Sequence, residues 1–278
     1  MIAVRRGAGV VPAPVSEAHP VCDIGHSLPA TSPSIIPTKL SRITLLLFIV
    51  LLGCHAPVRP GTVIPWAWER REDLRFAGAR EIAFLAATIT IDGDRVDTRP
   101  RMQPLRVADG ARVIPVIRIE ARHSAGPATV GRVAGDIARI AARVHPGLVQ
   151  IDFDATRSQR AWYAALLQDL RGRLEPSTRI SITALASWCG DDRWLQALPI
   201  DEAVPMLFRM GSDTRLVRAR LRHGDDFKEP LCRSSLGIAT DEPLDRAPAA
   251  GRRLYVFHTA KWDAAAWRVA KEEIARWE

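Results

Sequence analysis

The sequence predicts an α/β fold in which residues 62–278 form one (β/α)8 TIM-type barrel, regular or irregular. Short apolar segments alternate with amphipathic ones along this whole stretch. There are eight apolar segments, which is the number of strands that closes such a barrel. A doubly wound open sheet is the rival, but that fold usually carries a Gly-rich loop after its first strand, and the sequence has none there.

The expected strands are rich in β-branched and other apolar residues and end in polar or turn-forming residues. They are Thr62–Trp68, Glu81–Ala87, Arg112–Ile119, Leu148–Asp154, Arg179–Trp188, Glu202–Phe208, Leu236–Thr240 and Arg253–His258. Apolar residues spaced i, i+3, i+4 and i+7 predict helices at Ala128–Val144, Ser158–Leu174 and Asp263–Trp277. Ile91–Asp94 has the composition of a tight turn, which predicts a β-hairpin inserted after the second strand.

A charged and then apolar segment precedes this domain. Ile43–Leu52 is an apolar run of ten residues, about half of the roughly twenty that a spanning helix needs. Lys39 and Arg42 supply the positive charge that begins a secretory signal peptide. We therefore interpret 39–53 as a signal peptide and 1–38, which lacks hydrophobic periodicity, as a disordered leader or a wrongly assigned start.

Leu51–Cys54 resembles a lipobox, the lipoprotein pattern in which the Cys thiol receives diacylglycerol and cleavage follows the preceding Gly. The alternative is a buried apolar helix with an incidental Cys. The resemblance implies that Cys54 becomes the lipidated first residue, that 54–61 is a short linker, and that the protein is anchored in the cell envelope. His55 stands where an inner-membrane retention signal would carry Asp, so the outer membrane, facing the periplasm, is the expected location.

The net charge of +8 and the pI near 10 would suit a nucleic-acid-binding protein. However, only four of the positive charges are Lys, the Arg are spread along the chain, and no nucleic-acid-binding motif is present. The densest basic stretch, 215–222, intersperses its charges with apolar residues as the solvated face of a helix does. We expect no nucleic-acid partner.

The cysteine positions suggest one disulfide. Cys22 lies in the leader and Cys54 is used for lipid, which leaves Cys189 and Cys232 in an oxidising compartment. Their expected positions argue against pairing, since Cys189 follows the fifth strand and Cys232 precedes the seventh, at opposite ends of the barrel. The sequence offers no His or Cys spacing typical of a metal site, so we expect no metal. We also expect no cofactor and a monomer.

Carboxylates gather at the predicted C-terminal ends of the strands, where barrel enzymes place their active sites. Because strand side chains alternate, Asp152 and Asp154 of the fourth expected strand should face the barrel interior. At the end of the third expected strand, Arg118 and Glu120 should point to the same side as each other. Converging carboxylates are what a glycosidase uses for its acid and its base or nucleophile, so these three acids are the candidate catalytic residues. The alternative is that Arg118 simply neutralises Asp152 inside the barrel.

Tryptophans fall at the same strand ends, and flat indoles can stack on sugar rings while carboxylates hold the hydroxyls. The alternative is that they only pack the barrel mouth. The candidate substrate-binding residues are Trp66, Trp68, Trp188, Asp241 and Glu242. Trp262 also lies at a strand end. A metal-dependent deacetylase would need His and Asp in ligand positions, and the scattered His residues argue against it.

The segment Gln150–Thr156 resembles the fourth-strand signature of chitinase-like glycosidases, in which alternating Asp residues lead to a catalytic Glu. Val204–Arg209 resembles their sixth-strand Met–aromatic segment. Asp152 and Asp154 match the signature, but Thr156 occupies the position of the acid Glu. The resemblance therefore implies a glycosidase-like barrel without implying that family's substrate-assisted mechanism.

Over residues 62–278 the chain also resembles an uncharacterised bacterial lipoprotein family, domain of unknown function 3142. The segments that carry this resemblance are Val63–Glu69, Val149–Asp154 and Gly237–Glu242. It implies a barrel and no established activity. Two functions follow as hypotheses: a lipid-anchored barrel that hydrolyses or binds a polysaccharide, or a non-catalytic carbohydrate-binding or envelope assembly lipoprotein on a degenerate barrel.

Overall fold

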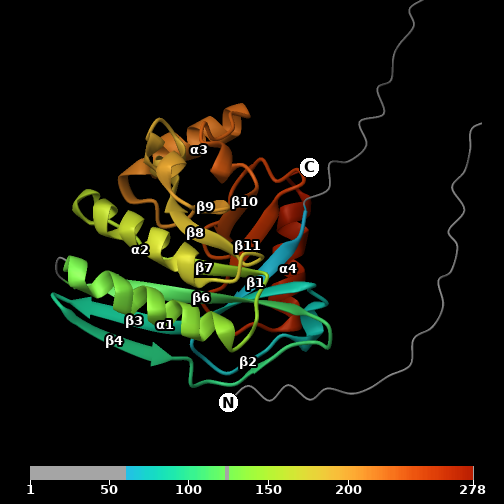
Figure 1. Cartoon of the computed structure of the whole chain (residues 1–278). Coiled ribbons are helices and arrows are strands. Elements are labelled where there is room, and N and C mark those ends of the chain that lie inside the picture. The colour runs from blue at the N-terminus through green and yellow to red at the C-terminus, as the bar shows by residue number, and fades with distance from the viewer. Residues whose placement is uncertain (1–60, 123–124, 278) are drawn as a thin grey trace, which may run out of the picture. The chain divides into compact units, whose positions relative to one another are not determined.

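Eight parallel strands close into a barrel, as predicted (Figure 1). The computed structural model describes residues 61–122 and 125–277. The strands follow one another around the barrel in chain order, and β1 pairs with both β3 and β11, which closes the ring. They are β1 (Val63–Ala67), β3 (Glu81–Asp92), β6 (Arg112–Ala121), β7 (Leu148–Asp152), β8 (Arg179–Leu185), β9 (Glu202–Met206), β10 (Ser235–Ala239) and β11 (Arg253–Phe257).

The outer layer is irregular, because only some of the connections contain an α-helix. The helices are α1 (Val130–Ala142) after β6, α2 (Arg160–Arg173) after β7, α3 (Thr214–His223) after β9 and α4 (Ala264–Ala275) after β11. Figure 1 shows α1 and α2 lying side by side against the barrel. The connection from β8 to β9 contains only the short 3-10 segments Ala186–Cys189 and Arg193–Ala197. The three expected helices are present as α1, α2 and α4, each end within two residues of its expected position.

Strand parity divides the buried residues into two apolar clusters. Val149, Ile151 and Phe153 pack outward with the helices, whereas Leu148 of the same strand belongs to a smaller cluster inside the barrel. The inner cluster also holds Trp66, Val116 and Tyr255. Because successive side chains of a strand point to opposite faces, this pattern places Asp152 on the inner side, as the sequence predicts.

An extra residue at Ala86 changes the course of β3. The register with β6 shifts between Leu85 and Ala87, which is the mark of a β-bulge. Before the bulge β3 pairs with β1, and after it the same edge pairs with β4 (Arg95–Pro100). The predicted hairpin is thus present, with Gly93 in the left-handed conformation its turn requires (φ 60°). A small second sheet joins β2 (Glu72–Asp73) to β5 (Leu105–Arg106).

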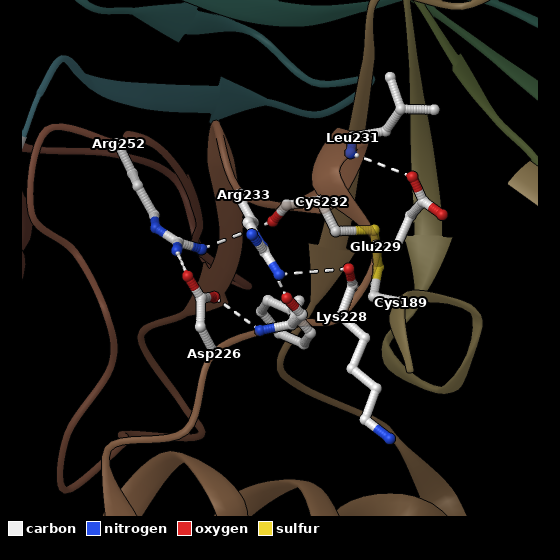
Figure 2. Close-up of a disulfide and its surroundings, with 9 residues drawn as sticks. Cys189, Asp226, Lys228, Glu229, Leu231, Cys232, Arg233 and Arg252 are labelled. Carbon is white, nitrogen blue, oxygen red and sulfur yellow. Dashed lines mark hydrogen bonds and ion pairs between the residues drawn. A yellow bond between two sulfur atoms is a disulfide. The ribbon is translucent and has the colours of Figure 1, made fainter. Parts of the chain in front are cut away.

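Cys189 and Cys232 form a disulfide, with Cα atoms 5.8 Å apart (Figure 2). The expectation that they lie at opposite ends of the barrel is therefore wrong. The short segments that carry Cys189 and Cys232 both pack against β9, which lies between β8 and β10. The backbone N–H groups of Lys228 and Glu229 also donate to the carbonyl oxygen of Cys189, at 3.1 and 3.2 Å. The chain before β10 thus runs along the barrel wall to reach Cys189.

Within the described residues, no helix combines the length and apolarity that crossing a bilayer requires. Four N-terminal predictions concern residues that the structure does not describe: the leader 1–38, the signal peptide 39–53, the lipidation of Cys54, and the linker 54–61 apart from Gly61. They remain predictions from sequence.

Candidate functional site

A cavity of about 210 Å³ lies at the carboxyl ends of the barrel strands. Residues at or just beyond the ends of β1, β7, β8, β9 and β11 form its wall, together with one residue inside β6. They are Trp68, Arg118, Asp152, Asp154, Leu185, Ala186, Met206, Phe208, Arg209, Met210, Asp213 and Phe257. This rim is where the loops of a (β/α)8 barrel meet and where its enzymes carry their chemistry.

Asp152 is engaged on both of its carboxylate oxygens. The Arg118 guanidinium donates to Oδ2 at 2.8 Å, and the Thr183 hydroxyl donates to Oδ1 at 2.9 Å. Arg118 is shared, because its Nε also donates to Glu120 at 3.2 Å. A carboxylate held in this way can stabilise charge and orient its neighbours, but it is poorly placed to exchange a proton with a substrate. The neutralising pair that the sequence raised as an alternative for Asp152 is therefore present.

Asp154, which follows β7, also lines the cavity. It lies two residues beyond the end of the strand and is exposed. The surrounding walls partly desolvate its carboxyl group and raise its pKa, and the negative charge of Asp152 raises that pKa further, while Arg118 opposes both effects. A carboxyl group with a raised pKa keeps its proton at higher pH, which is what a general acid requires.

Thr156, at the position of the chitinase-like acid, has a structural function in this chain. It is the N-cap residue of the 3-10 turn Arg157–Gln159, which leads directly into α2. Its backbone N–H donates to the Gln159 side chain at 2.8 Å, as in a capping box. The position therefore begins a helix and supplies no carboxyl group.

Aromatic side chains form one side of the cavity. Trp68, Phe208 and Phe257 line it, with Phe257 between the other two at ring-centroid distances of 6.0 and 4.8 Å. Trp66 lies beneath them, fully buried, with its ring 4.2 Å from that of Phe257. Trp68 is half-buried and lines the cavity, and an indole is a side chain on which a sugar can stack.

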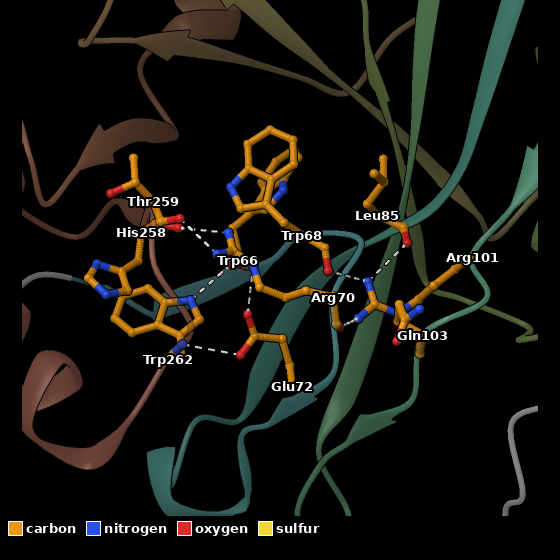
Figure 3. A network of polar contacts seen from close by, with 10 residues as sticks. All are labelled: Trp66, Trp68, Arg70, Glu72, Leu85, Arg101, Gln103, His258, Thr259 and Trp262. Carbon is orange, nitrogen blue, oxygen red and sulfur yellow. Dashed lines mark hydrogen bonds and ion pairs between the residues drawn. The ribbon is translucent and has the colours of Figure 1, made fainter.

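A polar network holds the backbone that carries Trp68 (Figure 3). The Arg101 guanidinium donates to the carbonyl oxygens of Trp68, Arg70 and Leu85, and so joins the end of β1 to the bulge in β3. Arg70 in turn forms an ion pair with buried Glu72 at 3.2 Å.

The same network reaches the chain that follows β11. The Glu72 carboxylate accepts a hydrogen bond from the Trp262 backbone N–H at 3.2 Å, and the Trp262 indole donates to the Trp66 carbonyl oxygen at 2.9 Å. Trp262, which the sequence places at a strand end, thus belongs to the support of the rim. Burial raises the pKa of the Glu72 carboxyl group.

Five of the eight predicted site residues do not line the cavity. Trp66 is under its floor, and Glu120 is exposed beside Arg118. Trp188 lies in the outer core against Trp194, at a centroid distance of 5.0 Å, because the chain turns into a 3-10 segment once β8 ends at Leu185. The remaining two, Asp241 and Glu242, follow β10 and also lie outside the lining.

Arg209, Met206, Phe208 and Asp213 line the cavity but were not predicted as site residues. The sequence did offer a signal, since Val204–Arg209 carried the resemblance to the sixth-strand segment of chitinase-like glycosidases. Gly237 has a packing function here, because a Cβ atom at that position would lie 2.3 Å from the Met206 sulfur. Among the described residues, no cluster of His, Cys, Asp and Glu is arranged to hold a metal ion.

Comparison with solved structures finds this barrel in proteins of very different sequence. A Streptomyces coelicolor protein provisionally named chitinase A superposes with a TM-score of 0.52 at 10% identity, over 77% of this chain and 97% of the other. A GH18 chitinase from Pseudoalteromonas aurantia matches with a TM-score of 0.46 at 9% identity, over 77% and 100%. Phosphoribosyl anthranilate isomerase from Thermus thermophilus matches with a TM-score of 0.40 at 13% identity, over 78% and 100%.

No protein-family model matches the sequence, and no curated protein matches it. The resemblance to chitinase-like barrels thus holds for the fold, which by itself does not determine an activity. Membership of domain of unknown function 3142 remains a prediction.

Proposed function

We propose that this chain is a lipid-anchored protein of the bacterial cell envelope whose barrel binds a polysaccharide at the rim cavity and hydrolyses it. One observation carries the proposal: Asp154, a carboxyl group with a raised pKa, lines a cavity that also presents the aromatic ring of Trp68. Acid and stacking surface together are what glycoside hydrolysis needs. The anchor rests on the sequence of residues 39–54.

Sugar binding rests on the aromatic side of the cavity. A pyranose ring has an apolar face that can lie on Trp68, while its hydroxyl groups face Asp154 and Asp213. The volume of about 210 Å³ suits one sugar unit better than several. The cavity would therefore hold one unit of a longer chain, whose neighbouring units extend over the rim.

In the proposed reaction, protonated Asp154 donates its proton to the glycosidic oxygen as the bond from that oxygen to the anomeric carbon breaks. Water then adds to the anomeric carbon and gives its proton to a second carboxylate. Asp213 is the cavity acid for this second step, because Asp152 is already engaged by Arg118 and Thr183. Asp152 and Arg118 support the reaction by setting the charge around Asp154.

A binding-only function is the second candidate, and the position of Thr156 favours it. The residue that would be the acid in the chitinase-like signature here caps a helix. A barrel without catalytic activity could still hold a glycan through Trp68 and the polar rim. The enzyme would cleave a bound polysaccharide, whereas the binding protein would leave it intact.

The experiment that separates them uses the full chain, solubilised in detergent. The protein is screened against an array of bacterial and plant glycans, and each bound glycan is then incubated with it while new reducing ends are measured. Hydrolysis supports the enzyme if Asp154→Asn lowers the rate by about a hundredfold or more and still binds. Asp97→Asn, an exposed acid on β4 outside the cavity, is the matched control. Binding without hydrolysis supports the second candidate, and no binding contradicts both.

A further inference from the structure

Arg209 is the cavity cation whose guanidinium has no side-chain or backbone partner among the described residues. It lines the cavity and is exposed. Within residues 61–122 and 125–277, its guanidinium takes part in no ion pair or hydrogen bond. Arg118, the other cavity arginine, contacts Asp152 at 2.8 Å and Glu120 at 3.2 Å. The guanidinium of Arg118 is therefore already occupied by protein carboxylates, whereas that of Arg209 has N–H donors available for a ligand.

The negative charges of the cavity acids are compensated by groups other than Arg209. Asp152 is held by Arg118 and Thr183. Burial and the charge of Asp152 raise the pKa of Asp154, and Arg118 is the cation that lowers it. Asp213 lies at the N-terminus of α3, where the helix dipole stabilises a negative charge. No acid of the cavity is thus paired with Arg209.

The backbone at Arg209 is held in an uncommon conformation. Its φ is 51°, in the left-handed region that residues other than Gly rarely adopt. Both carboxylate oxygens of Glu242 accept from the Arg209 backbone N–H, at 3.2 and 3.1 Å. Such a conformation persists where the surroundings determine it, and it is frequent at ligand sites. Glu242, predicted to bind substrate, thus holds the backbone of a residue that lines the cavity.

We propose that Arg209 binds a carboxylate group on the sugar, so that the polysaccharide of this site is an acidic one built from uronic acids or other carboxyl-bearing sugars. This inference rests on the proposed function, since it names the substrate class of the same cavity. A guanidinium binds a carboxylate through two parallel N–H donors, which gives both affinity and orientation. Because Trp68 and Arg209 line the same cavity, a sugar ring on Trp68 and its carboxylate on Arg209 would occupy one site.

The test measures selectivity rather than activity alone. The full chain in detergent is titrated with uronic-acid oligosaccharides and with their carboxyl-reduced counterparts, which keep the ring and linkage but lose the charge. We expect the wild type to bind at least one acidic oligosaccharide about 10- to 100-fold more tightly than its reduced form. Arg209→Ala should remove this preference, and Arg209→Lys should restore part of it, because a lysine keeps the charge but not the fork.

Arg132→Ala, which removes an exposed arginine of α1, is the matched control and should retain the preference. Equal binding of acidic and reduced forms by the wild type would overturn the inference and leave the proposed function standing. A preference that survives in Arg209→Ala would also overturn it. If neither form nor any neutral glycan binds, the proposed function fails together with the inference.

Discussion

Arg118 and Asp152 lie opposite each other on β6 and β7 and form an ion pair of 2.8 Å directed into the barrel. The Asp152 side chain is 10% exposed and that of Arg118 is 33% exposed. Such a pair matters to the free energy of unfolding mainly because removal of one partner would leave the other charge buried and uncompensated. It thus connects the stability of the barrel to the electrostatics of the cavity above it.

Replacement of Arg118 should show this connection. We expect Arg118→Met to lower the free energy of unfolding by about 2–3 kcal/mol, less than a fully buried pair because Arg118 is partly solvated. The double variant Arg118→Met/Asp152→Leu should lose less than the sum of the single changes, since no buried charge remains unpaired. Urea denaturation of the four proteins measures the coupling, and strict additivity would contradict it.

Asp154 should give the protein a distinct pH dependence. Its folded pKa lies above the ordinary value of 3.8, so the folded chain binds more protons than the unfolded chain between those two pKa values. Stability from this group therefore falls as the pH rises through that window and stays lower above it. We expect Asp154→Asn to gain stability relative to the wild type as the pH rises from 3 to about 7. A constant difference across this range would contradict the raised pKa.

Trp66 and Trp68 should differ although they are two residues apart. Trp68 lines the cavity and is only half-buried, so Trp68→Ala should weaken glycan binding about tenfold and lower stability less than Trp66→Ala does. Trp66 is fully buried, so Trp66→Ala should lower the free energy of unfolding by about 3–5 kcal/mol. Binding isotherms and denaturant unfolding of both variants separate the two effects. A larger loss of stability in Trp68→Ala and a larger loss of binding in Trp66→Ala would contradict the positions of Trp66 beneath the cavity and Trp68 in its lining.

The disulfide should contribute strongly to stability. Cys189 and Cys232 are separated by 43 positions, and closing a loop of that length stabilises a fold by up to about 4 kcal/mol in the chain-entropy estimate. We expect a reducing agent to lower the denaturation midpoint of the wild type. The variant Cys189→Ser/Cys232→Ser should unfold at that lower midpoint with or without reductant. A wild type that is insensitive to reductant under denaturing conditions would contradict this.

Cys54 should carry the lipid. In cells fed labelled palmitate, the wild type should be labelled and Cys54→Ala should not. Cys22→Ala, which changes a cysteine of the leader, is the control and should be labelled as the wild type is. Mass spectrometry of the mature protein should find Cys54 as its first residue. Equal labelling of Cys54→Ala would exclude this anchor.

The sequence by itself determined the number of strands, the hairpin and the side of the fourth strand that faces inward. These follow from local rules: side chains alternate along a strand, so Ile151 and Phe153 had to pack against the helices if Asp152 faced the barrel. The apolar segments were long enough for the strand positions to be predicted within a few residues.

Only the tertiary structure decided which strand ends share a cavity. Trp188 and Asp154 both follow a strand, yet the chain after β8 turns outward while Asp154 stays at the rim. Arg209 reaches the cavity because Glu242, from a loop 33 residues later in the chain, holds its backbone. Likewise, Cys189 meets Cys232 because the chain before β10 runs along the barrel wall. Such positions depend on contacts between segments far apart in sequence, which no local periodicity encodes.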